Sequence, residues 1–248
     1  MDKKTWVVIG VLAVGFLGLL GISIWQKNAE KPRIDGETSQ IFEASPESGN
    51  LPENIDGSPD APVILYEYGD YQCTACAPMN PYINQLKEEY GDKLAIVFRT
   101  TIMSYHQNGT AAASAANAAA IQGYWKEYKD LLFTNQNDWY YSDSTTRQEQ
   151  FEEYFKKASN GKGDLEKFRS DMGSEAVRKK IAFDEALAQK TVIEFTPTFY
   201  VEDEFVSQRT EDNGGIEITT SQFLDKLRAA INQRLTAQGI ALPEKSNS

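Results

Sequence analysis

Histidine and cysteine are scarce in this sequence, which has one histidine, His106, and two cysteines, Cys73 and Cys76. A structural zinc site takes four ligands, mostly thiolates and imidazoles. These three side chains are too few to complete one, so we expect no metal and no other cofactor. We expect His106 to cap a helix or to form a surface hydrogen bond rather than to transfer protons, because the local sequence pairs it with no base.

Basic residues are in deficit as well. The 248 residues include 25 Lys and Arg against 36 Asp and Glu, a formal net charge of −11. This charge favours solubility and argues against nucleic acid and anionic lipid headgroups as partners. No internal repeat is present, and a hydrophobic content of 41% is enough for one well-buried domain.

The two cysteines lie between a predicted strand and a predicted helix. Pro62–Tyr68 is β-branched, aromatic and mostly apolar, which favours a buried strand, and Met79–Tyr90 has helical spacing. Two cysteines three residues apart on a helical turn have Cα atoms about 5 to 6 Å apart, which suits a disulfide. The pair is therefore expected to open and close.

The two cysteines are expected to have different roles. Cys73 should lie at the helix N-terminus, where free N–H groups and the helix dipole favour a thiolate, which makes it the nucleophile. Cys76, one turn deeper, should be the resolving thiol. One alternative is half of a zinc site, for which further ligands are lacking. The other is a permanently closed disulfide that only stabilises the fold. A disulfide that closes so short a loop removes little entropy from the unfolded chain, so the redox interpretation is favoured.

The N-terminus is predicted to be a membrane anchor within residues 1–27. Trp6–Trp25 carries no charge, and as a helix it would span about 30 Å with a tryptophan at each end. A cleavable signal peptide is the alternative, since Gly21 and Ser23 offer a small-x-small site, but the apolar run is longer than usual for a signal peptide. A disulfide-exchanging domain belongs in an oxidising space, so we expect it outside the cytoplasmic membrane.

The rest of the chain is predicted to be a linker, one domain and a tail. Residues 28–60 are polar with scattered prolines and are expected to form a flexible linker without secondary structure. Residues 61–240 form the domain, with a helical insertion at about 104–190, and residues 241–248 form a loose tail. Further strands and the closing helix of the domain are expected at Lys93–Arg99, Thr196–Val201, Phe205–Ser207 and Ser221–Ala237.

From Pro62 to Gln238 the sequence resembles the thioredoxin-like superfamily, and specifically the membrane-anchored DsbA-like thiol–disulfide oxidoreductases of bacteria. The resemblance depends on Cys73-Thr74-Ala75-Cys76 after a strand, on Phe195-Thr196-Pro197-Thr198, which is similar to the family's cis-proline loop, and on the long helical insertion. It implies an α/β thioredoxin-like fold with a helical insertion after an N-terminal transmembrane helix.

The resemblance also implies a site. Thr196 and Pro197 should contact substrate through a cis peptide bond next to the Cys73 sulfur, together with Thr74 and Ala75 between the cysteines. Glu67, six residues before Cys73, matches a buried carboxylate near the resolving cysteine, and we expect it to accept a proton from Cys76.

The expected function is disulfide exchange with cysteine-containing polypeptides, with oxidation of the substrate as the favoured direction. The strongest oxidants of the family carry a histidine between the cysteines, and Thr74-Ala75 has none, so a less extreme potential is expected. A reductase or isomerase, and a non-catalytic binding module with a closed disulfide, are the alternatives. The resemblance further implies a membrane redox partner that regenerates the disulfide.

Overall fold

The computed structural model of the protein describes residues 32, 34, 36–208 and 218–243. The chain divides into a unit of residues 1–33 and a unit of residues 34–248, and the sheet and the helices around it belong to the second unit. The predicted anchor at 1–27 lies outside the described residues, as does most of the predicted tail at 241–248. Within the described ranges, no helix is long and apolar enough to cross a membrane.

A five-stranded mixed sheet lies at the centre, with strand order β1-β3-β2-β4-β5. The central strand β2 and its neighbour β3 are parallel and buried along their whole length, whereas the other pairs are antiparallel. A parallel pair needs a crossover, and α2 (Cys76–Tyr90) supplies it. The strands are β1 (Asn54–Asp56), β2 (Val63–Gly69), β3 (Leu94–Thr100), β4 (Thr198–Val201) and β5 (Glu204–Val206).

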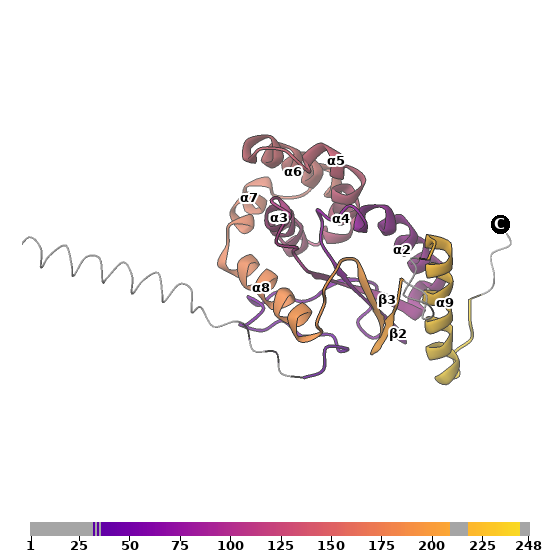
Figure 1. Cartoon of the computed structure of the whole chain (residues 1–248). Helices are drawn as coiled ribbons and strands as arrows, with labels where there is room; N and C mark the ends of the chain where they lie inside the picture. Colours follow the sequence, from indigo (N-terminus) through magenta and orange to yellow (C-terminus); the bar gives the residue numbers. More distant parts are fainter. Residues whose placement is uncertain (1–31, 33, 35, 209–217, 244–248) are drawn as a thin grey trace, which may run out of the picture. The chain divides into compact units, whose positions relative to one another are not determined.

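Helices cover both faces of this sheet (Figure 1). Val63 and Leu65 of β2 pack against α2 and α9 (Thr220–Ala237), while Tyr66 and Tyr68 face the side that α8 covers. Strand side chains alternate between the faces, so one buried strand contributes to two cores. Between β3 and α8 the chain forms α3 (Gly109–Ile121), α4 (Trp125–Thr134), α5 (Gln136–Trp139), α6 (Ser144–Ala158) and α7 (Leu165–Met172); α8 is Glu175–Lys190, and η1 (Gly91–Lys93) precedes β3.

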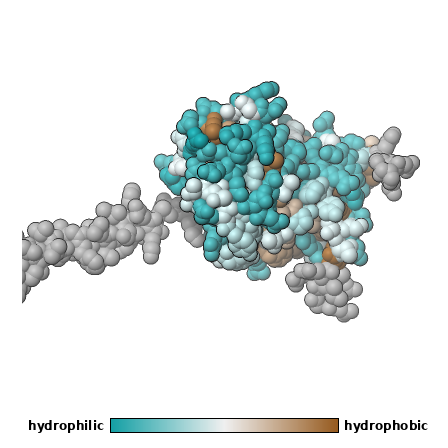
Figure 2. Space-filling view, turned by 90° about the horizontal axis from the view of Figure 1, so that it is seen from above, coloured by the Kyte–Doolittle hydropathy of each residue, from teal (hydrophilic) through white to brown (hydrophobic). Residues whose placement is uncertain are grey.

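The helices from α3 to α8 occupy most of the segment in which a helical insertion was expected. They share a core with Phe98 of β3 and with the two cysteines. The alanines of α3 are buried among aromatic side chains of α4, α6 and α7. Small residues let neighbouring helices approach closely, which leaves room for the large rings around them. The face of the molecule in Figure 2 is mostly hydrophilic, with small and separate hydrophobic areas, as the acidic composition suggests.

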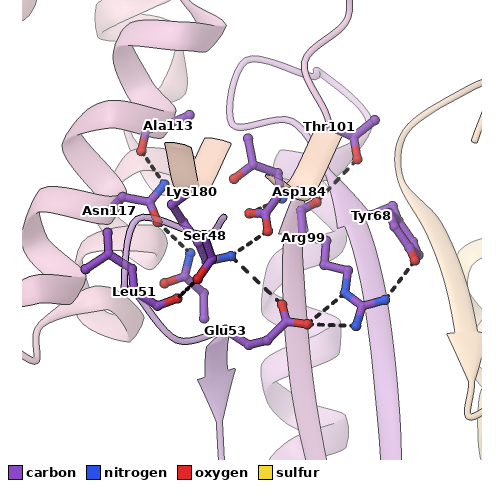
Figure 3. Close-up of polar contacts among 12 residues, drawn as sticks. Ser48, Leu51, Glu53, Tyr68, Arg99, Thr101, Ala113, Asn117, Lys180 and Asp184 are labelled. Atoms are coloured by element: carbon purple, nitrogen blue, oxygen red, sulfur yellow. Dashed lines mark hydrogen bonds and ion pairs between the residues drawn. The ribbon is translucent and has the colours of Figure 1, made fainter. Parts of the chain in front are cut away.

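The prediction that residues 28–60 form a flexible linker without secondary structure is wrong for the part from Thr38 to Asp56. β1 lies in this segment and pairs with β3. Just before it, the buried Glu53 accepts hydrogen bonds at its Oε1 from Arg99 Nη2, at 2.7 Å, and from Arg99 Nε, at 3.2 Å (Figure 3). Arg99 also donates to the carbonyl oxygens of Thr38 and Gln40. A guanidinium buried in a central strand needs acceptors, and this segment provides them.

A second buried ion pair lies next to the first. Lys180 of α8 pairs with Asp184, and its Nζ lies 3.9 Å from Glu53 Oε2 (Figure 3). Asp184 also accepts the backbone N–H of Thr100 at 3.2 Å, at the end of β3. The two basic and two acidic groups balance one another, so this cluster fastens the N-terminal segment and α8 to the sheet without a net buried charge.

Candidate active site

Both cysteines lie in the connection between β2 and α2. The backbone N–H of Cys73 donates to the carbonyl oxygen of Asp70 at 3.0 Å, which forms a tight turn after β2. The helix begins at Cys76, so Cys73 precedes it and Cys76 opens it, one turn later than the sequence predicted. Both residues are free thiols, and Cys73 is 7% exposed whereas Cys76 is fully buried. Only Cys73 is therefore within reach of another protein.

The surroundings displace the pKa values of the two thiols in opposite directions. A hydrogen bond from the Cys76 thiol is the largest influence on the pKa of Cys73. Together with a hydrogen bond of the Thr196 side chain and the N–H groups of Cys76 and Ala75, it outweighs burial and lowers this pKa to about 6. Burial, followed by the hydrogen bond and the charge of Cys73, raises the pKa of Cys76 well above its usual value. Near neutral pH the pair therefore consists of a Cys73 thiolate and a Cys76 thiol.

The loop before β4 lies against the Cys73 sulfur. The Thr196–Pro197 peptide bond is cis, as predicted from the sequence. The Cys73 Sγ lies 3.3 Å from the carbonyl oxygen of Thr196, to which the thiol can donate, although the two residues are 123 positions apart. Thr74 and Ala75 are both exposed in the turn that holds Cys73. A polypeptide that reaches the sulfur would therefore meet this turn and the Thr196 loop together.

Glu67 lies in the middle of β2 and is only 1% exposed. Its place in the strand puts it on the face that carries Val63 and Leu65, which α2 covers. Burial raises the pKa of Glu67 to about 7, Lys129 opposes this rise and Cys73 adds to it. Among the described residues, no hydrogen-bond partner contacts its Oε1. Glu67 also raises the pKa of Cys76, so a carboxyl group that titrates near neutrality lies within electrostatic reach of the buried thiol.

Lys129, the basic residue that acts on Glu67, was not predicted from the sequence. Lys129 lies on α4 and is buried, with its ammonium group 3.3 Å from Asp130. It also donates hydrogen bonds to the side-chain oxygens of Asn80 and Asn84 on α2. A lysine side chain on a helix with other polar residues is usually exposed to solvent. No local signal in the sequence distinguishes this one.

The prediction of a cap or a surface hydrogen bond for His106 is wrong, because its ring is buried and is paired with a carboxylate. His106 Nδ1 lies 2.7 Å from Asp70 Oδ2, on a residue 36 positions earlier in the chain. Asp70 follows β2 and His106 follows β3, and parallel strands bring their carboxyl ends to the same edge of the sheet. The rule places the two loops at the same edge, but the folded loop after β3 is needed to bring the ring to the carboxylate.

The arrangement is suited to thiol–disulfide exchange. It provides an accessible nucleophile with a lowered pKa, a buried second thiol one helical turn away and a carboxyl group that can exchange protons near neutral pH. In the described part of the chain, no three His, Cys, Asp or Glu side chains are placed to hold a metal ion.

Comparison with known sequences identifies a family. A family model described as thioredoxin matches residues 50–226. The Na(+)/H(+) antiporter NhaA 1 of Mycolicibacterium gilvum (strain PYR-GCK) is 32% identical over 152 residues, which are 60% of this chain and 23% of the antiporter. NhaA of Herminiimonas arsenicoxydans is 32% identical over 204 residues, 81% of this chain and 30% of that protein. The chain thus spans less than a third of the length of these curated relatives.

Solved structures share the fold. BdbD from Bacillus subtilis (oxidised) is 20% identical with a TM-score of 0.59, covering 79% of this chain and 98% of BdbD. Proteus mirabilis ScsC in a transitional conformation is 16% identical with a TM-score of 0.60 and 95% coverage of both chains. Wolbachia pipientis alpha-DsbA1 is 21% identical with a TM-score of 0.57, covering 78% of this chain and all of that one.

These likenesses confirm the expected thioredoxin-like α/β fold, with its five-stranded sheet and helices on both faces. The matched residues 50–226 include β1, β2, both cysteines and the cis Thr196–Pro197 bond. Because the family model matches more than half of the chain, this protein belongs to the thioredoxin family.

Proposed function

We propose that this protein is a thiol–disulfide oxidoreductase that exchanges disulfides with extracytoplasmic cysteine-containing polypeptides, in the oxidising direction, through Cys73 and Cys76. The observation that carries the proposal is the unequal placement of the two thiols: Cys73 reaches the surface beside the cis Thr196–Pro197 bond, whereas Cys76 is fully buried. In keeping with this placement, the surroundings lower the pKa of Cys73 to about 6 and raise that of Cys76. A stabilised Cys73 thiolate favours the reduced form of the pair. A protein whose reduced form is stabilised gives its disulfide to other proteins.

The proposed reaction starts from the disulfide form. A substrate thiolate attacks Cys73 Sγ, the Cys73–Cys76 bond breaks, and Cys76 leaves as a thiolate that takes a proton from Glu67. A second substrate thiolate then attacks the substrate sulfur of the mixed disulfide, and Cys73 leaves as the stabilised thiolate. The substrate has lost two electrons and gained a disulfide, and the protein now holds the dithiol. A membrane redox partner would restore the disulfide.

The substrate would be held next to Cys73. The carbonyl oxygen of Thr196 faces the sulfur and can accept an N–H from an extended chain, as a strand edge does. Pro197 follows it, and the exposed Thr74 and Ala75 lie in the same turn as the sulfur. The recognition would therefore use main-chain contacts, which accommodate many sequences.

The function is tested with a reduced peptide that contains two cysteines. The disulfide form of the protein should convert the peptide to its disulfide and lose one protein disulfide for each peptide oxidised. Recovery of reduced peptide and an intact protein disulfide would argue for a binding module. Reduction of a disulfide peptide by the dithiol form, with no reaction in the other direction, would argue for a reductase.

Glu67→Gln should remove a pH dependence from the step in which Cys76 attacks the mixed disulfide. This step needs Cys76 to lose its proton to an ionised Glu67, so in the wild type its rate should rise as the pH increases through about 7. Glutamine accepts no proton, so the variant should be slower by about 10² at pH 8. The measurement is the release of glutathione from Cys73 between pH 5 and 9. An unchanged pH profile in the variant would exclude the proton role.

We also propose that Trp6–Trp25 stays in the mature protein as a single-pass anchor with Cys73 outside the cytoplasmic membrane. The reason is the uncharged apolar run together with the need of a disulfide for an oxidising space. Protease is added to intact cells whose cytoplasmic membrane is accessible from the medium. It should release the domain from the membrane fraction. Survival of the domain, under conditions that digest a known exterior protein, would contradict this topology.

A further inference from the structure

We propose that His106, held by Asp70, is the base that takes the proton from the incoming substrate thiol. This inference rests on the proposed function and adds a residue to it. The exchange needs a thiolate on the substrate side, and Glu67 lies on the buried side of the cysteine pair. A cysteine thiol has a pKa of about 8.5, so most substrate thiols are still protonated at neutral pH. A base on the exposed side would supply the missing step.

The Asp70 carboxylate is fixed from three directions. Its Oδ1 accepts the N–H of Gln72 at 2.9 Å, and its Oδ2 accepts the N–H of Met103 at 2.9 Å in addition to facing the His106 ring at 2.7 Å. The first residue of α3, Gly109, packs so closely that a Cβ there would lie 3.2 Å from Oδ1. Both oxygens of Asp70 thus act as hydrogen-bond acceptors in this site.

A charged Asp70 sets the tautomer of His106. A carboxylate only accepts, so Nδ1 must carry the proton and Nε2 is left with a lone pair. Among the hydrogen bonds of the described residues, none uses Nε2. Tyr105, which packs edge-on against the ring with centroids 4.5 Å apart, is largely exposed, so the ring lies just beneath the surface. Nε2 is therefore able to accept a proton from a molecule that binds there.

The pair is attached to the turn that holds Cys73. The carbonyl oxygen of Asp70 accepts the N–H of Cys73, while its side chain holds the His106 ring. Tyr140, with a ring centroid 6.4 Å from that of His106, is also within electrostatic reach of Cys73 and of Asp70. Asp70 thus connects the His106 ring to the backbone of the nucleophile.

Other ionisable groups around the ring are few. Tyr105 lies on its own loop, Tyr140 follows α5, and Arg147 of α6 binds the side chain of Asn108, two residues beyond His106. In the proposed step the substrate S–H proton passes to Nε2, the substrate thiolate attacks Cys73, and the imidazolium returns the proton to water.

The test compares the wild type with His106→Gln, which can still donate a hydrogen bond to Asp70 but cannot titrate. The disulfide form of each protein reacts with a peptide that has one cysteine, and the rate of mixed-disulfide formation is measured between pH 5.5 and 9. At pH 6 the variant should be slower by about 10-fold. The ratio should approach one at pH 9, where the peptide thiol is already ionised. A purely structural role would give a ratio that does not change with pH.

A second variant covers the case in which His106→Gln disturbs the loop. His106→Ala should regain rate when imidazole is added at pH 6, and the wild type should not respond. A constant ratio, a ratio of one at every pH, or a lack of response to imidazole would each overturn the role of His106. Failure of the wild type to react with the peptide at any pH would instead refute the proposed function.

Discussion

Glu53→Ala should lower the free energy of unfolding by about 3 to 5 kcal/mol, since removing one partner of a buried ion pair leaves the other charge unpaired. The side chains of Arg99 and Glu53 are 0% and 2% exposed, and their closest atoms are 2.7 Å apart. Lys180 would lose a nearby negative charge as well. For a domain of this size, the melting temperature should fall by about 6 to 20 °C.

The matched control is Glu153→Ala on α6. Glu153 also forms an ion pair at 2.7 Å, with Lys156, but the two side chains are 57% and 50% exposed. Exposed pairs of this kind contribute little, so this variant should melt almost as the wild type does. Equal melting temperatures for the Glu53 and Glu153 variants would mean that the segment before β1 does not hold the domain together.

The elements that local patterns determine were predictable from the sequence. β2 and β3 are runs of β-branched and aromatic residues, and α9 has an apolar stripe, so Val63–Gly69, Leu94–Thr100 and Thr220–Ala237 lie within a residue or two of their predicted places. The cysteine turn was predicted from its motif after a strand, and the cis Thr196–Pro197 bond was predicted from the resemblance to the thioredoxin-like superfamily.

The contacts that the sequence analysis missed all join distant residues. The segment before β1 is polar and resembles a linker, and only the buried Arg99 of β3 shows why it is ordered. Asp70 and His106 look unrelated until β2 and β3 bring them together. In the sequence, Lys129 lies among residues typical of an exposed helix. In the structure, it lies on the face of α4 that packs into the core. Tertiary packing decides these three cases, and no local pattern records it.

A Cys76→Ala variant should accumulate mixed disulfides through Cys73, because Cys73 remains accessible and no second thiol can release the bound polypeptide. The variant lacks the hydrogen bond from the Cys76 thiol, so the pKa of its Cys73 should be higher than in the wild type. Cys73→Ala should accumulate none and should lose all exchange activity. The remaining Cys76 is fully buried, and its pKa is raised well above that of an ordinary thiol. A substrate therefore cannot reach it, and it is not a thiolate at neutral pH.

The most direct measurement is therefore a non-reducing gel of the two variants after rapid acid quenching of the cells that produce them. The expected result is a ladder of higher bands for Cys76→Ala, which a reductant removes, and a single band at the mass of the free chain for Cys73→Ala. Equal ladders for the two variants, or no ladder for either, would contradict the assignment of Cys73 as the nucleophile and with it the proposed exchange reaction.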